Sequence, residues 1–366
     1  MAAQHRPLVV IRQARVFSAL NNSDYSTLIA SLEQRRLREG EALCTQGEPG
    51  NAMYVLASGA LELRLEGEDG GSETIGRLEP GEVVGEMSCI DSAPRSASVV
   101  AVSEEGATVF KLSGLTFRRF KEVSPRLASS ILRGVVAHVT ERLRQIHAQV
   151  RALRAAPTWV EATEAAGEAL APGSVSLDEL AALDSLRGWE LDRLLELAPP
   201  RGYGDGEVLC KEGEAGDACF LVVQGEVEVL KATHQGDELL AVLGRGALVG
   251  QMALVDGAER SATVRARGEV VTLRLTRDTF EALLREDNPL GLRVQEVTAV
   301  AGIRQLRMAN RWLVSAATAT RRGEQVSAEE ESIAGLESAL GEWGVEIDAL
   351  DAPPIAVSLD PHPAEI

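Results

Sequence analysis

Residues 40–65 read GEALCTQGEPGNAMYVLASGALELRL, and residues 206–231 repeat this stretch as GEVLCKEGEAGDACFLVVQGEVEVLK. The repeat continues, because GRLEPGEVVGEMSCIDSAPRSASVVA at 76–101 is matched by AVLGRGALVGQMALVDGAERSATVRA at 241–266, with one residue deleted between the two blocks. Self-similarity of this kind indicates a duplicated structural unit. The chain is therefore predicted to contain two copies of one domain.

Each copy has the pattern of short strands rather than of helices. Apolar and polar residues alternate on either side of Gly59 and again on either side of Gly225. Glycines recur at matching positions in the two copies, where tight turns between strands are expected. An antiparallel roll fits this pattern better than a βαβ sheet, because no helix separates successive strands. We predict a mainly β fold with flanking α: two tandem antiparallel β-roll, jelly-roll-like domains with helices at both ends.

Helical patterns flank each predicted roll. NNSDYSTLIASLEQRRL at 21–37 begins with good N-capping residues, and LDSLRGWELDRLLEL at 183–197 takes the same place before the second roll. Residues 289–322 are also expected to be helical. The boundaries that follow are 15–155 for the first domain, 156–176 for an Ala-rich linker that contains Pro157 and Pro172, 177–315 for the second domain, and 324–366 for a mobile acidic tail.

A heptad pattern follows the first roll. Its apolar positions keep a 4,3,4,3 spacing over about three heptads: Leu132, Val136, Val139, Leu143, Ile146, Val150 and Leu153. Such a seam is expected to pack against another element. It fits either a homodimeric coiled coil or docking on the neighbouring roll, and both remain open.

Composition excludes several classes of function. The formal charge of −18 argues against an extended grip on nucleic acid or anionic lipid. No apolar run reaches the roughly 20 residues of a membrane span, and the N-terminus lacks the layout of a signal peptide, so a cytoplasmic protein is expected. The cysteines show no metal-ligand or disulfide spacing and are predicted to be small buried hydrophobes: Cys44, Cys89, Cys210 and Cys219.

The segment from Gly85 to Ala97 carries the chemistry. Gly85 permits close approach of a ligand to the backbone, a short helical turn exposes amide groups, and Arg95 follows ten residues after the glycine. Together these features form a cradle for an anion. The structural alternative is that Glu86 and Arg95 pair only with each other, although a surface pair contributes under about 1 kcal/mol.

These residues resemble the phosphate-binding cassette of the cyclic nucleotide-binding domain family, whose pattern is Gly-Glu, a short apolar helix and Pro-Arg-Ser/Ala/Thr-Ala. The resemblance implies that Glu86 accepts a hydrogen bond from the ribose 2′-hydroxyl and that Arg95 pairs with the cyclic phosphate. The implied ligand is cAMP or cGMP, with no cofactor and no metal. The ligand-binding residues expected in the first copy are Gly85, Glu86, Met87, Ser88, Arg95, Ser96 and Ala97.

The second copy departs from this pattern at one position, because Gln251 replaces the glutamate. A hydrogen bond to a neutral acceptor is weaker than one to a carboxylate, so ribose binding is expected to weaken about tenfold. Nucleotide binding and a purely structural role both remain open for this copy. Its candidate residues are Gly250, Gln251, Met252, Ala253, Arg260, Ser261 and Ala262.

In the family, a residue from the helix after the roll covers the base. By resemblance the candidates are Ile146 or His147 in the first copy and Trp312 in the second, where a large ring could stack on a purine. Each is also suited to packing in a helix seam, and that alternative stays open.

The sequence contains no GxxxxGK[ST], HExxH or GxSxG motif, so no enzyme activity is expected. The acidic segment after the second roll offers no basic recognition helix, which disfavours a transcription regulator. Tandem rolls resemble the regulatory subunit of cAMP-dependent protein kinase. However, no Arg-Arg-x-Ser/Ala inhibitor sequence is visible ahead of the first roll and no dimerisation segment is expected there, so kinase inhibition is not predicted.

The sequence therefore predicts a cyclic-nucleotide sensor that changes contacts between its domains or with an unidentified protein partner. A homodimer is compatible with this role. The alternative is a scaffold that uses the rolls for oligomerisation without ligand.

Overall fold

A computed structural model describes residues 9–66, 72–153, 168–169, 188–233, 236–285 and 288–322. The expected acidic tail at 324–366 and the expected linker at 156–176, apart from residues 168–169, lie outside the described residues. Within the described part of the chain, no helix has the length and apolar character needed to cross a membrane.

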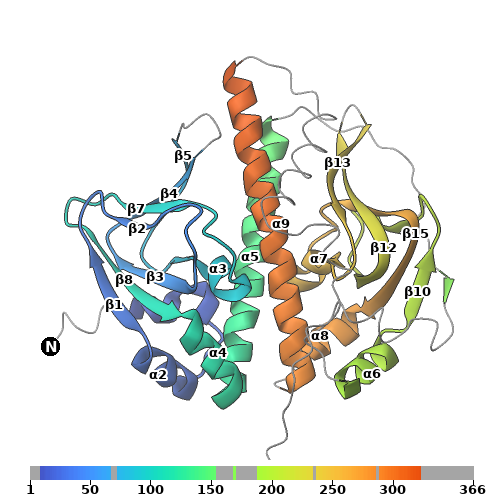
Figure 1. Ribbon diagram of the computed structural model, residues 1–366, viewed down its shortest axis with the longest axis horizontal. Helices are drawn as coiled ribbons and strands as arrows, with labels where there is room; N and C mark the ends of the chain where they lie inside the picture. Colours follow the sequence, from blue (N-terminus) through green and yellow to red (C-terminus); the bar gives the residue numbers. More distant parts are fainter. Residues whose placement is uncertain are drawn as a thin grey trace, which may run out of the picture. The chain divides into compact units, whose positions relative to one another are not determined.

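The first roll consists of two four-stranded antiparallel sheets, in the orders β1-β8-β3-β6 and β2-β7-β4-β5. Its elements are η1 (Arg15–Phe17), α2 (Asn22–Ala30), β1 (Glu33–Leu37), β2 (Ala42–Cys44), β3 (Ala52–Ser58), β4 (Leu61–Glu66), β5 (Ser72–Leu78), β6 (Val83–Val84), α3 (Glu86–Asp91), β7 (Ser98–Ala101), β8 (Ala107–Ser113), α4 (Gly114–Val123) and α5 (Pro125–Leu153). The short helix α3 interrupts the strands and is the only helix between β1 and β8 among the described residues (Figure 1).

The second roll repeats this plan with longer, bent strands. Its antiparallel sheet has the order β13-β12-β15-β10-β9, with β11 paired to β15 and β14 to β12. Its elements are β9 (Glu168–Ala169), α6 (Gly188–Leu197), β10 (Pro200–Tyr203), β11 (Val208–Cys210), β12 (Ala218–Thr233), β13 (Gly236–Leu243), β14 (Leu248–Val249), α7 (Gln251–Asp256), β15 (Thr263–Thr276), α8 (Arg277–Arg285) and α9 (Pro289–Arg322). The prediction of two antiparallel rolls with flanking helices is confirmed.

The turn glycines bring strands closer together than a side chain would allow. A Cβ on Gly59, where φ is +86°, would lie 2.3 Å from the carbonyl oxygen of Gly106. A Cβ on Gly225, where φ is +78°, would lie 2.3 Å from the carbonyl oxygen of Glu269. The repeated glycines therefore mark a close backbone crossing that both rolls need.

The first flanking helix is shorter than predicted. The side chain of Asn21 accepts a hydrogen bond from the amide of Asp24 and caps α2, but the helix ends at Ala30 instead of continuing to residue 37. Residues 33–37 form β1, which pairs along its length with β8. Strand pairing therefore overrides the helical pattern of EQRRL, which is a tertiary effect on local propensity.

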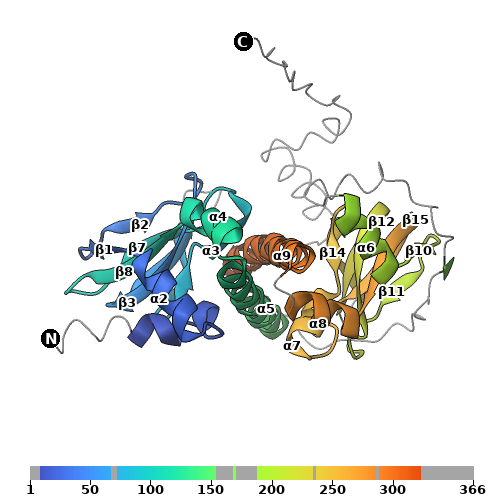
Figure 2. The same cartoon turned by 90° about the horizontal axis from the view of Figure 1, so that it is seen from below.

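The heptad seam on α5 is covered within the chain. Figures 1 and 2 show α5 and α9 side by side, and Val139 of α5 meets Gly302 of α9 so closely that a Cβ on the glycine would lie 3.0 Å from a Val139 methyl carbon. The seam residues with described side chains are all buried in this core: Leu132, Val136, Val139, Leu143 and Ile146. They share it with Ala299, Ile303 and Leu306 of α9. The described part of the seam packs on α9, the helix that follows the second roll, whereas the prediction named the roll itself as the docking surface.

The cysteines lie in the apolar cores as predicted. All four are free and buried. Burial raises the pKa of Cys89 to about 12 because the thiolate form loses its hydration. Burial raises the pKa of Cys44 and of Cys219 for the same reason, so these three thiols stay protonated, and all four cysteines pack as small hydrophobes.

Candidate functional site

The Gly85 backbone begins the anion cradle of the first roll. Gly85 adopts a φ of +79° as the N-cap of α3, and Ser92 at the other end of the helix has a φ of +57°. Two left-handed residues thus confine α3 to a short turn that leads directly into Pro94 and Arg95. Glu86, Met87 and Ser88 are all buried at its start.

Arg95 extends into this cradle from the other side. Its Nη1 donates to the carbonyl oxygens of Ala52 at 2.8 Å and Gly85 at 3.3 Å, and the guanidinium carbon lies 5.6 Å from the centre of the Tyr54 ring. Only 6% of Arg95 is exposed. Among the described residues, no carboxylate forms an ion pair with it, and its Nε has no hydrogen-bond partner.

This arrangement bears directly on whether Glu86 and Arg95 simply pair with each other. They do not pair in the structure. A buried cation without an anion is costly, often by several kcal/mol. The site thus holds a positive charge whose natural complement is an anion, while its main-chain partners fix the guanidinium in place.

The loop before β3 fixes the backbone of Arg95. The amide of Gly47 donates to the carbonyl of Arg95 at 2.9 Å, and the amide of Arg95 donates to the carbonyl of Glu48 at 2.9 Å. Gly50 lies against the guanidinium, because a Cβ there would lie 2.6 Å from Arg95 Nε and 2.7 Å from the Ser88 Cβ. The glycine at position 50 therefore leaves the space that Arg95 occupies.

Glu86 faces a histidine that the sequence analysis did not single out. His138 projects from α5, and its Nε2 lies 4.0 Å from Glu86 Oε1. Burial lowers the pKa of His138 more than the carboxylate of Glu86 raises it. In the sequence, the only sign that His138 could be buried was its position next to the seam residue Val139 in the heptad pattern of α5.

The buried imidazole predicts a dependence of stability on pH. Because the folded-state pKa of His138 lies below its ordinary value of 6.5, the unfolded chain takes up a proton first as the pH falls. Stability is therefore expected to fall between pH 7 and pH 5, by on the order of 1 kcal/mol per pH unit at most. Urea unfolding at several pH values should show a smaller fall in a His138→Gln variant. Equal slopes for the two proteins would contradict this assignment.

The remaining predicted residues of the first copy line the same turn. The Ser88 hydroxyl donates to the carbonyl of Pro94 at 3.4 Å, and the Ser96 hydroxyl lies 3.8 Å from the sulfur of Met87. Ala97 is buried beside them. The structure thus brings the whole predicted set together around Gly85 and Arg95.

The second roll reproduces the turn with a different charge balance. Gly250 has a φ of +76°, and Arg260 Nη1 donates to its carbonyl at 2.8 Å. Arg260 Nη2 also donates to Asp217 at 2.9 Å, and Asp217 forms a further ion pair with Arg274. The matching residue in the first copy is Asn51, which carries no charge. The second arginine therefore has a carboxylate partner that the first lacks.

Gln251 is 2% exposed and is held by the helix that follows its roll. Its Nε2 donates to Gln305 Oε1 at 3.1 Å, whereas its own Oε1 has no partner among the described residues. An apolar cavity of about 110 Å³ lies here. Its lining includes all seven residues predicted for this copy, together with Gln305, Met308 and Ala309 of α9.

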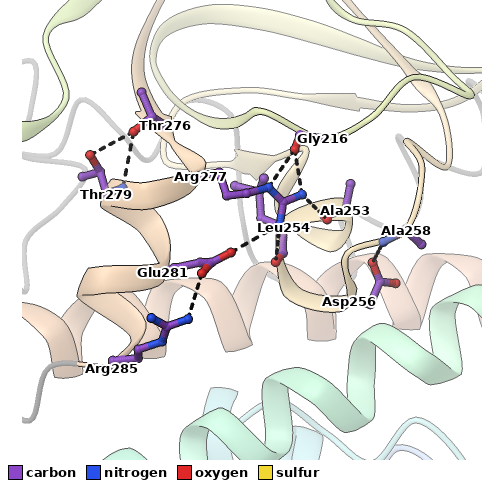
Figure 3. Close-up of polar contacts among 10 residues, drawn as sticks. All are labelled: Gly216, Ala253, Leu254, Asp256, Ala258, Thr276, Arg277, Thr279, Glu281 and Arg285. Atoms are coloured by element: carbon purple, nitrogen blue, oxygen red, sulfur yellow. Dashed lines mark hydrogen bonds and ion pairs between the residues drawn. The ribbon is translucent and has the colours of Figure 1, made fainter.

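A further arginine pins the short helix of the second roll. Arg277, the first residue of α8, donates to the carbonyls of Gly216 at 2.7 Å, Ala253 at 3.0 Å and Leu254 at 3.4 Å (Figure 3). In the first copy the residue at this position is Gly114, which begins α4. The second α7 turn is thus clamped by its own roll, and the first α3 turn lacks that clamp.

Of the three residues expected to cover a base, the structure describes the side chain of Ile146 alone. Ile146 is buried in the core that α5 shares with α9, so its side chain packs in the seam. The side chains of His147 and Trp312 lie outside the described residues.

Comparisons with known proteins match both rolls to one family. Residues 34–123 and 200–287 match the model of the cyclic nucleotide-binding domain family. The cAMP-dependent protein kinase regulatory subunit of Blastocladiella emersonii is 24% identical over 270 residues, which are 74% of this chain and 56% of that protein. The corresponding protein of Yarrowia lipolytica is 28% identical over 269 residues, 74% of this chain and 58% of that protein.

The chain thus spans little more than half the length of these relatives. Among solved structures, the regulatory domain of Toxoplasma gondii PKA with cAMP covers 78% of this chain and 94% of its own at 20% identity, with a TM-score of 0.31. The duplicated sequence, the paired antiparallel rolls and the two family matches lead to one assignment: residues 34–123 and 200–287 are two cyclic nucleotide-binding domains in tandem.

Proposed function

We propose that the first roll binds a cyclic nucleotide and that the chain acts as a regulatory sensor. The observation that carries this proposal is Arg95, a nearly buried guanidinium that forms no ion pair with any described carboxylate. A cyclic phosphate would supply the missing negative charge. Glu86, buried at the start of α3, would accept a hydrogen bond from the ribose 2′-hydroxyl.

The other residues of the turn would complete this ligand site. Gly85, Met87 and Ser88 supply its backbone, and Ser96 and Ala97 follow the arginine. The Ser96 hydroxyl is compatible with either cAMP or cGMP. We include both nucleotides as ligand candidates.

A regulatory role is supported by the kind of relative that the chain resembles, because both relatives are named as regulatory subunits of a protein kinase. Nucleotide bound between α3 and Arg95 would bias the position of α3, and through it the packing of α5 and α9. A ligand shifts such an equilibrium only by its difference in affinity for the two arrangements. The output would be a changed contact with a protein partner.

The second roll supports a different role. Arg260 is already paired with Asp217, α7 is clamped by Arg277, and Gln251 replaces the ribose acceptor. These contacts favour a weaker nucleotide site or a structural one. The scaffold alternative therefore fits the second roll better than the first.

Calorimetric titration of the full chain with cAMP and with cGMP tests the proposal. Binding of at least one nucleotide is expected, with a Kd that Glu86→Gln raises about tenfold because a neutral acceptor replaces a charged one. Glu104→Gln, at an exposed position in the same roll, is the control and should leave the Kd unchanged. The absence of heat with either nucleotide at millimolar concentration would reject the sensor function.

A further inference from the structure

The last helix of the second domain contacts the phosphate cassette of the first. Arg307 of α9 donates from Nε and Nη2 to the two carboxylate oxygens of Asp91, at 3.2 and 3.3 Å. Its Nη1 donates to the carbonyl of Pro94 at 2.8 Å. Arg307 and Asp91 are 216 positions apart in the sequence. Their contact is almost fully buried, because only 7% of the Arg307 side chain and 10% of the Asp91 side chain are exposed.

The last helix of the first domain makes the same contact in the opposite direction. Arg144 of α5 forms an ion pair with Asp256 and donates from Nη2 to the carbonyl of Glu259 at 2.9 Å. In the aligned repeats, Asp256 and Glu259 take the places of Asp91 and Pro94. Each acceptor carbonyl belongs to the residue immediately before a cassette arginine.

We propose that α5 and α9 form a reciprocal brace, in which Arg144 and Arg307 act as positioning residues for the cassette of the opposite domain. Each arginine binds the end of a short cassette helix and the peptide that leads into Arg95 or Arg260. A bidentate guanidinium contact fixes both distance and direction, which a single charge would not do. Moving either cassette therefore disturbs the helix of the other domain.

The two halves of the brace differ in strength. The second cassette is held from its own roll by Arg277, whereas Gly114 occupies that position in the first roll. The Arg144 pair is also more exposed, at 28% and 25% for its two side chains. The first cassette thus depends more on Arg307 than the second depends on Arg144.

The brace gives the proposed nucleotide site a route to the second domain. A ligand that shifts α3 changes the contacts of Arg307, and α9 also carries Gln305, which holds Gln251. By linkage, any effect of the first cassette on the second is matched by an effect in the other direction. This part of the inference rests on the proposed function, whereas the brace itself does not.

Hydrogen exchange of the full chain, measured by mass spectrometry without nucleotide, tests the brace. Arg307→Gln is expected to speed exchange in residues 86–97 about tenfold or more, because Asp91 loses its buried partner. Arg144→Gln should speed exchange in residues 251–262 by a smaller factor. Arg304→Gln, on an exposed position one turn away on α9, should change neither segment. Unchanged exchange in residues 86–97 of Arg307→Gln would overturn the brace.

The same measurement with saturating cAMP tests the coupling. In the wild type, exchange should slow in residues 86–97 and change in residues 251–262, and Arg307→Gln should lose the second response. Protection of the first cassette in both proteins with no response in the second would overturn the coupling while leaving nucleotide binding intact. No effect of cAMP or cGMP in any segment would reject the proposed function instead, and the brace would then be judged by its nucleotide-free exchange.

Discussion

Replacing Arg95 with lysine is expected to raise the Kd for nucleotide at least about 100-fold. The guanidinium of Arg95 uses Nη1 for the carbonyls of Ala52 and Gly85 and keeps its Nε without a partner. A lysine ammonium is a point charge that cannot hold both carbonyls and still present a planar pair of donors to a phosphate. Each lost hydrogen bond to a charged group costs about 1.5–3 kcal/mol of binding free energy. A loss at the upper end of this range corresponds to the expected rise of about 100-fold in Kd.

Isothermal titration of the wild type and of Arg95→Lys measures this effect directly. Arg36→Lys makes the same chemical change at an exposed position of β1 in the same roll and should bind as the wild type does. Thermal melting of the variants shows whether the fold is retained. A Kd for Arg95→Lys within a few-fold of the wild type would mean that the phosphate does not contact this arginine.

Replacing Gly134 with alanine is expected to destabilise the chain by about 3 kcal/mol, although alanine is the better helix former. A Cβ at Gly134 in α5 would lie 2.1 Å from the carbonyl oxygen of Val16 and 2.6 Å from its carbonyl carbon. Val16 and Phe17 of η1 are themselves completely or almost completely buried, so η1 cannot move away from α5 without disturbing its own packing. Overpacking of this kind usually costs about 1–3 kcal/mol and sometimes more.

The sign of the change distinguishes packing from propensity. Helix propensity alone would stabilise Gly134→Ala by up to about 1 kcal/mol and raise the Tm. The close contact with Val16 predicts a Tm lower by about 6–12 °C. Gly76→Ala is the matched control, because a Cβ there meets only a Leu63 methyl carbon at 4.0 Å. An unchanged or raised Tm for Gly134→Ala would show that η1 can move away from α5.

The duplicated fold was predictable because its determinants are local and occur twice. Gly59 and Gly225 stand at the same close crossing of the backbone, and alternation of apolar residues specifies the strands. The cradle was predictable for the same reason, since Gly85 and Arg95 belong to one short segment. The end of α2 was not predictable, because residues 33–37 become a strand only through pairing with β8.

The contacts that set the electrostatics of the two sites were not predictable from local pattern. His138 meets Glu86 only because α5 packs against the roll, and Arg307 meets Asp91 across 216 residues of sequence. The exchange of Asn51 for Asp217 is visible in the aligned repeats, but its meaning depends on the distance between Asp217 and Arg260 in the fold. Single-sequence patterns carry no information on such distances.

The pairing of α5 with α9 within one polypeptide has a consequence for how the protein behaves on dilution. Two separate chains that met through such helices would come apart as their concentration fell. Here the connection between the domains supplies a fixed local concentration of each helix for the other. The proposed coupling between the two cradles would therefore be a property of a single molecule, with a strength that does not vary with the amount of protein present.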